Sequence, residues 1–285
     1  MELFIVDAFT DQIFGGNQAG VVLLNENEKF PDEPVMQKVA AEMKHSETAF
    51  VKAAGSRTFR FRYFTPEGEV DLCGHATVSA FTVLRNEKKL GTGNYIADTP
   101  AGSLHVTVEP DLIWLEMAQG KLLKYLTAEE SAEVYRAYGL DLRDQPETMR
   151  PCVVSTGLSD ILLPVGSREK LDGAVQNRSE VIRISKKHQV VGVHIFCCAS
   201  SPDVTAYCRN FAPLYGIDEE AATGTSNGAL TYYLFTNGLI HERDNHVFVQ
   251  GVRMGRPSVI RSRINGGRIS IGGQAVVSVS GHIRL

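Results

Sequence analysis

Two short segments of the chain place small and polar residues directly before an apolar run that is typical of a helix. Residues 73–75 read Cys-Gly-His, and residues 223–225 read Thr-Gly-Thr. A helix that begins at either glycine presents unpaired backbone N–H groups and the positive end of its dipole. Both segments are therefore candidate sites for a carboxylate or another anion. Ordinary helix capping is the alternative explanation of the same pattern.

The polar side chains of the first segment raise three chemical possibilities: a proton shuttle, a cysteine nucleophile and a metal site. His75 titrates near neutral pH and can act as a donor or a proton shuttle, but a single histidine is more often structural. Cys73 could be a nucleophile if the helix dipole favoured its thiolate, or it could be a buried and inert thiol. A metal site is not expected, because Cys73 and His75 are two residues apart and the other cysteines bring no histidine at zinc spacing.

The segment HSETAFV adds a carboxylate, Glu47, at the start of an apolar run that is typical of a strand. Partial desolvation at such a position could make this side chain a general base, although an isolated glutamate is usually solvated. Near the second segment, the hydroxyl and amide groups of Thr223, Thr225, Ser226 and Asn227 could complete a cage around a bound carboxylate.

Composition limits the kinds of partner. The 285 residues carry a formal net charge of −4, so neither nucleic acid nor an anionic membrane is an expected partner. Apolar runs all fall short of the roughly 18 residues that cross a bilayer, and the first residues are acidic where a secretory signal is basic. Five cysteines without a C-x-x-C pair indicate reduced thiols. We expect a cytoplasmic protein with a small-molecule partner and no nucleotide cofactor, because neither a P-loop nor a dinucleotide-binding loop occurs.

An internal repeat predicts the architecture. The segment RYFTPEGEVDLCGHATVSAFTVL begins at Arg62, and RNFAPLYGIDEEAATGTSNGALTYYLF begins at Arg209. Each passes from Arg-x-Phe-x-Pro through acidic residues to a small-residue turn and an apolar run that would be buried around most of its circumference. We therefore expect two similar halves, each with a sheet curled around one central helix, and a cleft between them.

Local patterns predict the other elements. A helix is expected after Asp32, with Pro34 in its first turn, and another at Thr127, where Glu130 completes a capping box. The second of these helices would bury Val134, Tyr135 and Tyr138. Strands are predicted at 58–64, 103–109, 112–117, 152–155, 160–165, 190–199, 246–251 and 268–273.

Several of these segments together resemble the phenazine-biosynthesis PhzF-like family of isomerases. The match runs in order through VDAFTDQIFGGNQAGVV, HSETAFV, the two repeat segments and QGVRMGRPS, over nearly the whole chain. The resemblance implies an α+β fold like that of diaminopimelate epimerase, in which two similar halves each wrap a strongly curved mixed sheet around a central helix. We expect a first domain of residues 1–125, joined by 277–285, and a second of 126–276, with the active site in the cleft between them. Family members commonly form homodimers.

The resemblance also implies roles for particular residues. Glu47 would be the general acid/base, His75 would lie beside the substrate, and Glu220 would orient it or share protons with it. The family more often has Asp at the position of Glu220 and Ser at that of Thr225, and an added methylene alters the reach of a carboxylate. In the epimerase relatives two cysteines face each other across the substrate. Cys73 matches the first, but Thr223 occupies the second.

A threonine hydroxyl is too weak an acid to replace a thiol, so the sequence disfavours two-thiol epimerisation. The expected function is cofactor-independent isomerisation of a small carboxylate-bearing substrate, with Glu47 as the proton carrier. Backbone N–H groups at Gly74, His75, Gly224 and Thr225, aided by Thr223, would hold the anion. The alternatives are an amino-acid racemase or epimerase that uses Glu47 with Cys73 or His75, and an anion-binding protein without catalysis.

Overall fold

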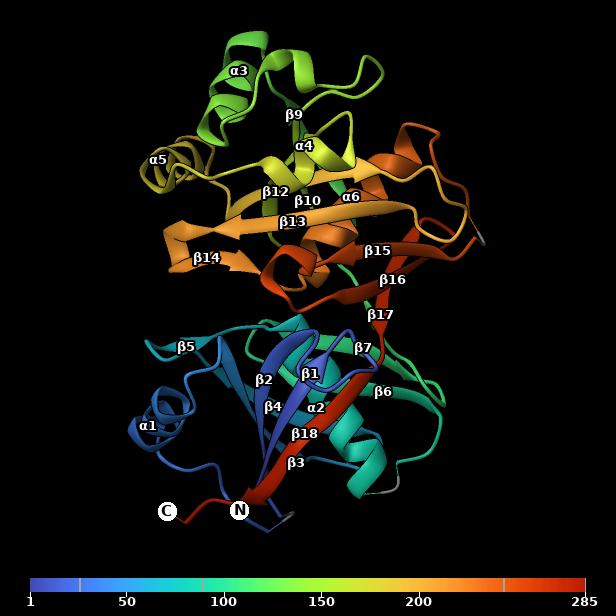
Figure 1. Ribbon diagram of the computed structural model, residues 1–285. Helices are drawn as coiled ribbons and strands as arrows, with labels where there is room; N and C mark the ends of the chain where they lie inside the picture. The colour runs from blue at the N-terminus through green and yellow to red at the C-terminus, as the bar shows by residue number, and fades with distance from the viewer. Residues whose placement is uncertain (26, 89, 243, 285) are drawn as a thin grey trace. The chain divides into compact units, whose positions relative to one another are not determined.

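A computed structural model describes residues 1–25, 27–88, 90–242 and 244–284 (Figure 1). The chain forms two compact units. Unit 1 comprises Met1–Glu116 and Gly272–Leu285, and unit 2 comprises Met117–Ile271. The boundaries that we predicted, after residues 125 and 276, lie a few residues further along the chain. Each unit is described by itself below.

Unit 1 is built from a mixed sheet and two helices. Its elements are β1 (Glu2–Ala8), β2 (Asn17–Leu23), α1 (Glu33–Met43), β3 (Glu47–Ala53), β4 (Thr58–Phe64), β5 (Glu69–Val70), α2 (Gly74–Glu87), β6 (Gly93–Thr99), β7 (Gly102–Val108), β8 (Ile113–Glu116) and β18 (Ala275–His282). The pairs β2/β3 and β4/β6 are parallel, and the chain between the members of each pair contains α1 and α2, respectively. The pairs β18/β1, β1/β2, β3/β4, β6/β7 and β7/β8 are antiparallel.

The sheet of unit 1 wraps around α2. This helix contacts β18, β1, β2, β3 and β8, which come from both ends of the strand order. Ten consecutive side chains of α2, from His75 to Leu84, are buried, as expected for a helix with apolar residues around most of its circumference. On the other side of the sheet, α1 packs Met36, Val39 and Ala40 against the strands. Figure 1 shows α2 enclosed by strands and α1 outside them.

Unit 2 repeats this plan with additional helices. Its elements are β9 (Lys121–Tyr125), α3 (Ala128–Ala137), η1 (Leu142–Asp144), β10 (Cys152–Ser155), β11 (Ser159–Pro164), α4 (Arg168–Gly173), α5 (Arg178–His188), β12 (Gly192–Cys198), β13 (Ala206–Ala212), η2 (Pro213–Tyr215), β14 (Ile217–Glu220), α6 (Gly224–Thr236), β15 (His246–Gln250), η3 (Val252–Met254), β16 (Ser258–Asn265) and β17 (Arg268–Gly273). Here β11/β12 and β13/β15 are the parallel pairs, matching β2/β3 and β4/β6.

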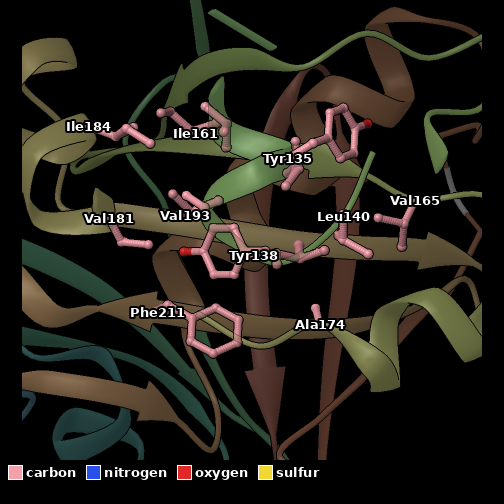
Figure 2. Close-up of a cluster of buried hydrophobic side chains, with 14 of the residues drawn as sticks. Tyr135, Tyr138, Leu140, Ile161, Val165, Ala174, Val181, Ile184, Val193 and Phe211 are labelled. Carbon is pink, nitrogen blue, oxygen red and sulfur yellow. The ribbon is translucent and has the colours of Figure 1, made fainter. Parts of the chain in front are cut away.

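The central helix of unit 2 is α6, which contacts β9, β10, β11 and β16. The opposite face of the sheet is covered by α3 and α5 through a separate apolar core (Figure 2). In that core Tyr138 lies 5.1 Å from Phe211, between ring centroids. Val181 and Ile184 of α5 are fully buried in the same cluster. The repeat therefore extends from the sequence to the order of strand pairing.

Most of the predicted elements are confirmed. Strands β4, β10 and β17 have the predicted ends, and the other predicted strands differ by one or two residues at an end. The capping box of α3 is present, since Thr127 Oγ1 accepts from the backbone N–H of Glu130 and the Glu130 carboxylate accepts from that of Thr127. We did not predict α4 or α5. The signal for α5 was available, because Asn177 caps its first turn by accepting from the N–H of Glu180.

Candidate active site

Glu47 is the first residue of β3 and follows the end of α1. That helix ends at Lys44 in a left-handed conformation, with φ of 57°, which turns the chain back toward the sheet. Glu47 pairs with Ala19 in the parallel register of β2 and β3, so its backbone position is fixed by the sheet. The side chain is 15% exposed, and its Oε2 lies 3.2 Å from His75 Nε2. A carboxylate and an imidazole, 28 positions apart in the sequence, are thus brought together.

His75 is the second residue of α2 and is 4% exposed. Its Nε2 also lies 3.2 Å from Ser46 Oγ, and its Nδ1 lies 3.3 Å from Cys73 Sγ. Burial lowers the pKa of His75 below its ordinary value, and the nearby Glu47 charge opposes this effect only in part. The lowered pKa favours the neutral form of the ring. A neutral ring has one donor and one acceptor nitrogen, and it can pass a proton between the carboxylate and the thiol.

Hydrogen bonds from buried side chains stabilise the start of α2. Cys73 is the N-cap residue in an extended conformation, and its carbonyl accepts a hydrogen bond from Thr77 Oγ1 at 2.7 Å. Thr77 Oγ1 is also 2.7 Å from Tyr63 Oη, within the core. These contacts fix the backbone that carries the first N–H groups of α2. Anion binding at Gly74 stays a prediction, and these contacts define the backbone at which it is expected.

One ligand atom from each of Glu47, Cys73 and His75 lies within 4.8 Å of the other two, as in a group that could hold a metal ion. Our prediction against a metal considered only the spacing of cysteines and histidines. It did not include a carboxylate contributed by β3. The oxygen, sulphur and nitrogen donors would suit Zn²⁺ in chemical type.

In unit 2, Glu220 ends β14 and Thr223 is the N-cap residue of α6. Thr223 Oγ1 donates to Glu220 Oε2 at 2.5 Å. Gln250 Nε2 donates to the Glu220 carbonyl at 2.7 Å and to Thr223 Oγ1 at 3.1 Å. Gly224 and Thr225 then form the first turn of the helix and are partly exposed. The predicted residues Glu220, Thr223, Gly224 and Thr225 therefore form one local group.

Two polar residues do not have the role that we expected. Ser226 is 1% exposed and donates to Asp160 Oδ2, while Asn227 has no exposed surface and donates to the Thr223 carbonyl at 2.9 Å. The prediction that these side chains complete a carboxylate cage is wrong. Because α6 is buried nearly all round, polar residues in its first turn point into the unit and bond there. Gln250 and Ser46 are site neighbours that the sequence analysis missed.

Comparison with known proteins identifies the family. The sequence profile described as phenazine biosynthesis-like protein matches residues 6–281. The chain belongs to this family. A relative from Clostridium acetobutylicum, named an uncharacterized isomerase, is 33% identical, with 96% of this chain and 95% of its own length covered. This family member is accordingly a PhzF-like isomerase.

Solved structures agree on the fold. The crystal structure of a Bacillus anthracis phenazine biosynthesis protein of the PhzF family superposes with a TM-score of 0.88 at 24% identity, covering 100% of this chain and 99% of the other. A hydroxyproline epimerase from Agrobacterium vitis gives a TM-score of 0.61 at 14% identity, covering 99% and 90%. The predicted α+β fold of the epimerase type is confirmed. Among the described residues, none of the helices is long and apolar enough to cross a membrane.

Proposed function

We propose that this protein is a cofactor-independent isomerase in which Glu47 moves a proton within a small carboxylate-bearing substrate. The observation that carries the proposal is the 3.2 Å approach of Glu47 Oε2 to His75 Nε2 at the start of α2. Oε2 is shielded from solvent, and among the described residues no donor is aligned with it in hydrogen-bond geometry. His75 Nε2 lies beside Oε2 and restricts this side of the carboxylate by contact, not by an aligned hydrogen bond, and we assign proton transfer to Oε1.

The proposed reaction begins when Glu47 removes a proton from an activated carbon of the substrate. The electron pair spreads through the conjugated system toward the substrate carboxylate. Backbone N–H groups at Gly74 and His75, together with those at Gly224 and Thr225 that the family resemblance includes, would stabilise this charge. Glu47 then returns the proton to another carbon on the same face. The product is a double-bond isomer with the same composition as the substrate.

The test is isomerisation in deuterated water, followed by ¹H NMR. Candidate substrates are small unsaturated carboxylates, beginning with the dihydro-hydroxyanthranilate used by the best-known family members. Migration of a double bond supports the proposal, and the deuterium content at the new C–H position reports how far the proton on Glu47 exchanges with solvent before it is returned. Glu47→Gln is expected to lower turnover by about 10³-fold, the usual contribution of a positioned general base, while calorimetry detects nearly unchanged carboxylate binding.

The matched control is Glu42→Gln, which removes an exposed carboxylate of α1 close to Glu47 in the sequence. Its turnover should equal that of the unchanged protein. If Glu47→Gln is as active as this control, the proposed base is wrong. Binding without any turnover across the candidate substrates would instead support an anion-binding protein without catalysis.

A racemase or epimerase is the second candidate. It is favoured by one contact, the 3.3 Å approach of Cys73 Sγ to His75 Nδ1, which provides a thiol as a possible second proton carrier. In deuterated water this reaction would invert a stereocentre and introduce deuterium at that carbon, with no movement of a double bond. Cys73→Ala would then reduce turnover as strongly as Glu47→Gln.

We also propose that the enzyme is a cytoplasmic homodimer. The free-thiol state of all five cysteines supports a reducing compartment, and the family resemblance supports the dimer. Light scattering coupled to gel filtration should give twice the 31.2 kDa chain mass. A mass equal to one chain would contradict the dimer.

A further inference from the structure

Gln250 is a fully buried polar residue at the end of β15. The residue that follows it, Gly251, has φ of 76°, and a side chain there would lie 2.3 Å from the Arg256 carbonyl oxygen and 2.6 Å from that of Ala221. The backbone next to Gln250 is therefore packed tightly against the segment that leads into α6. This packing holds the Gln250 amide directly beneath the helix start.

The orientation of the Gln250 amide is set by its backbone partners. Its Oε1 accepts from the Thr223 backbone N–H at 3.3 Å and from Asn227 Nδ2 at 2.9 Å. Its Nε2 donates to the Glu220 carbonyl at 2.7 Å. A backbone N–H can only donate and a carbonyl can only accept, so the reversed amide would lose both backbone bonds. The nitrogen of the amide consequently faces Thr223 Oγ1, at 3.1 Å.

This orientation fixes the single proton of the Thr223 hydroxyl. Since Thr223 Oγ1 accepts from Gln250, its own hydrogen is directed to the other neighbour, Glu220 Oε2, at 2.5 Å. Glu220 Oε2 is thus the acceptor of this hydrogen bond. The hydroxyl proton is committed to a residue within unit 2.

We propose that Gln250 is a positioning residue that directs the Thr223 proton to Glu220 and so withholds it from the substrate. The inference rests on the proposed function, which includes Glu220 and Thr223 in the site. Thr223 occupies the position at which the epimerase relatives have their second cysteine. With its proton committed to Glu220, Thr223 does not serve as the second acid, and proton transfer stays with Glu47. Gln250 thereby favours double-bond migration over inversion.

The test follows the Glu220 carboxyl directly and needs no substrate. Protein labelled with ¹³C at glutamate carboxyl groups is titrated by NMR, and the Glu220 signal is assigned by its loss in Glu220→Gln. Thr223→Val removes the donor, so the titration midpoint of Glu220 should rise by about one pH unit. Gln250→Met keeps the side-chain length but frees the hydroxyl to rotate, and the midpoint should rise by about half a unit.

The double variant decides whether Gln250 acts through Thr223. If it does, adding Gln250→Met to the Thr223→Val variant causes no further change in the titration midpoint of Glu220. Additive shifts would mean that Gln250 acts through the Glu220 backbone, and this result, like the absence of any shift in Gln250→Met, would overturn the proposal. If Gln250→Met does not fold, Gln250→Glu keeps the acceptor for the Thr223 and Asn227 donors, and its carboxylate should draw the hydroxyl proton away from Glu220.

The matched control is Ser262→Ala. Thr231 Oγ1 of α6 donates to Ser262 Oγ at 2.9 Å, and both residues are fully buried. This variant loses a buried hydrogen bond between α6 and the sheet but leaves Thr223 untouched, so the Glu220 midpoint should not move. The proposed function is tested independently of this inference. It is wrong if Glu47→Gln retains turnover, and that result would not change the titration of Glu220.

Discussion

The helix starts at Gly74 and Gly224 hold corresponding places in the two units, but their polar groups differ in what they can do with a proton. At Gly74 the neighbours are a carboxylate, an imidazole and a thiol, with His75 Nε2 3.2 Å from Glu47. At Gly224 they are a hydroxyl and an amide that hold a carboxylate in one hydrogen-bond arrangement. The proposals above accordingly assign proton transfer to the first helix start and retention of a proton to the second.

The difference originates in the strands beneath the helices. The parallel registers pair Phe59 with Ala97 in unit 1 and Ala206 with Phe248 in unit 2, so Thr99 of β6 corresponds to Gln250 of β15. Thr99 Oγ1 donates to the Gly102 carbonyl at 2.7 Å, within its own hairpin turn. Gln250 instead donates to Thr223 Oγ1 at the helix start. The two units therefore share their strand order but differ in the side chains that support the helix starts.

The largest expected difference between the units concerns stability. Arg209 makes a two-pronged ion pair with Glu219, both bonds at 2.8 Å, and donates to the Leu171 and Ala174 carbonyls. The corresponding Arg62 pairs with Glu69 at a more exposed site, where 25% of its side chain is accessible against 10% for Arg209. Arg209→Met should cost about 3–5 kcal/mol because it leaves a largely buried carboxylate unpaired.

Arg62 also makes a two-pronged pair with Glu69, but this pair is more accessible to solvent, so Arg62→Met should cost less, about 1–2 kcal/mol. Amide hydrogen exchange measures the stability of each unit in the same sample, with peptides from β13 reporting on unit 2 and peptides from β4 reporting on unit 1. The sole tryptophan, Trp114, lies in unit 1, and its fluorescence provides a second probe of that unit. Equal losses in the two variants would contradict this difference in burial.

The next largest effect concerns catalysis. His75→Gln should lower turnover by about 10- to 100-fold, because it removes the ring that holds the Glu47 carboxylate. Thr225→Ser, at the corresponding position of unit 2, should change turnover by less than about threefold, since the backbone N–H and a hydroxyl remain. Steady-state kinetics with any substrate that turns over provide the measurement. A stronger loss from the Thr225 variant would place the proton chemistry in unit 2.

The smallest expected effect is a pH dependence of stability. Burial lowers the pKa of His194 to about 3, so this ring stays neutral in the folded state where an unfolded histidine becomes protonated. The unfolded chain then binds more protons, and stability is lost as pH falls from about 6.5 toward 3, by at most about 1.4 kcal/mol per pH unit for this group.

His194→Asn should remove that contribution while an amide oxygen replaces the ring nitrogen beside Asn210. Burial also raises the pKa of Asp160, which makes an opposite contribution, so the comparison is between variant and unchanged protein. Urea unfolding at pH 7, 6 and 5 gives the slope of the free energy of unfolding against pH for each protein. His105→Asn, at an exposed position, is the control and should leave the slope unchanged. A slope that is the same in both variants would contradict the prediction.

Sequence patterns predicted features whose signal is local. The capping box at Thr127 and the small residues before α2 and α6 are examples, because hydrogen bonds within one turn determine them. The approach of Glu47 to His75 depends on the parallel pairing of β2 and β3 and on the burial of α2, so spacing alone did not reveal it. The residues alone made Glu47 a weak candidate for a general base, and the family resemblance made it the expected one.

Errors in the site came from side chains whose partners are distant in sequence. Ser226 looked available at a helix start, but it bonds to Asp160, which is 66 positions away. Gln250 begins the segment QGVRMGRPS that contributes to the family resemblance, but the segment gives no sign of its contact with Thr223, which depends on the register of β15 beside β13. Such roles depend on tertiary packing, which one sequence without a structure does not specify.

The strand β18 has a consequence for synthesis of the chain. One edge of β1 pairs with β2, but its other edge pairs with residues 275–282, at the far end of the sequence. During translation that edge remains uncovered until all of unit 2 has left the ribosome. Open strand edges template aggregation. The nascent chain is therefore most vulnerable just before residues 275–282 emerge, when chaperone binding to β1 would protect it best.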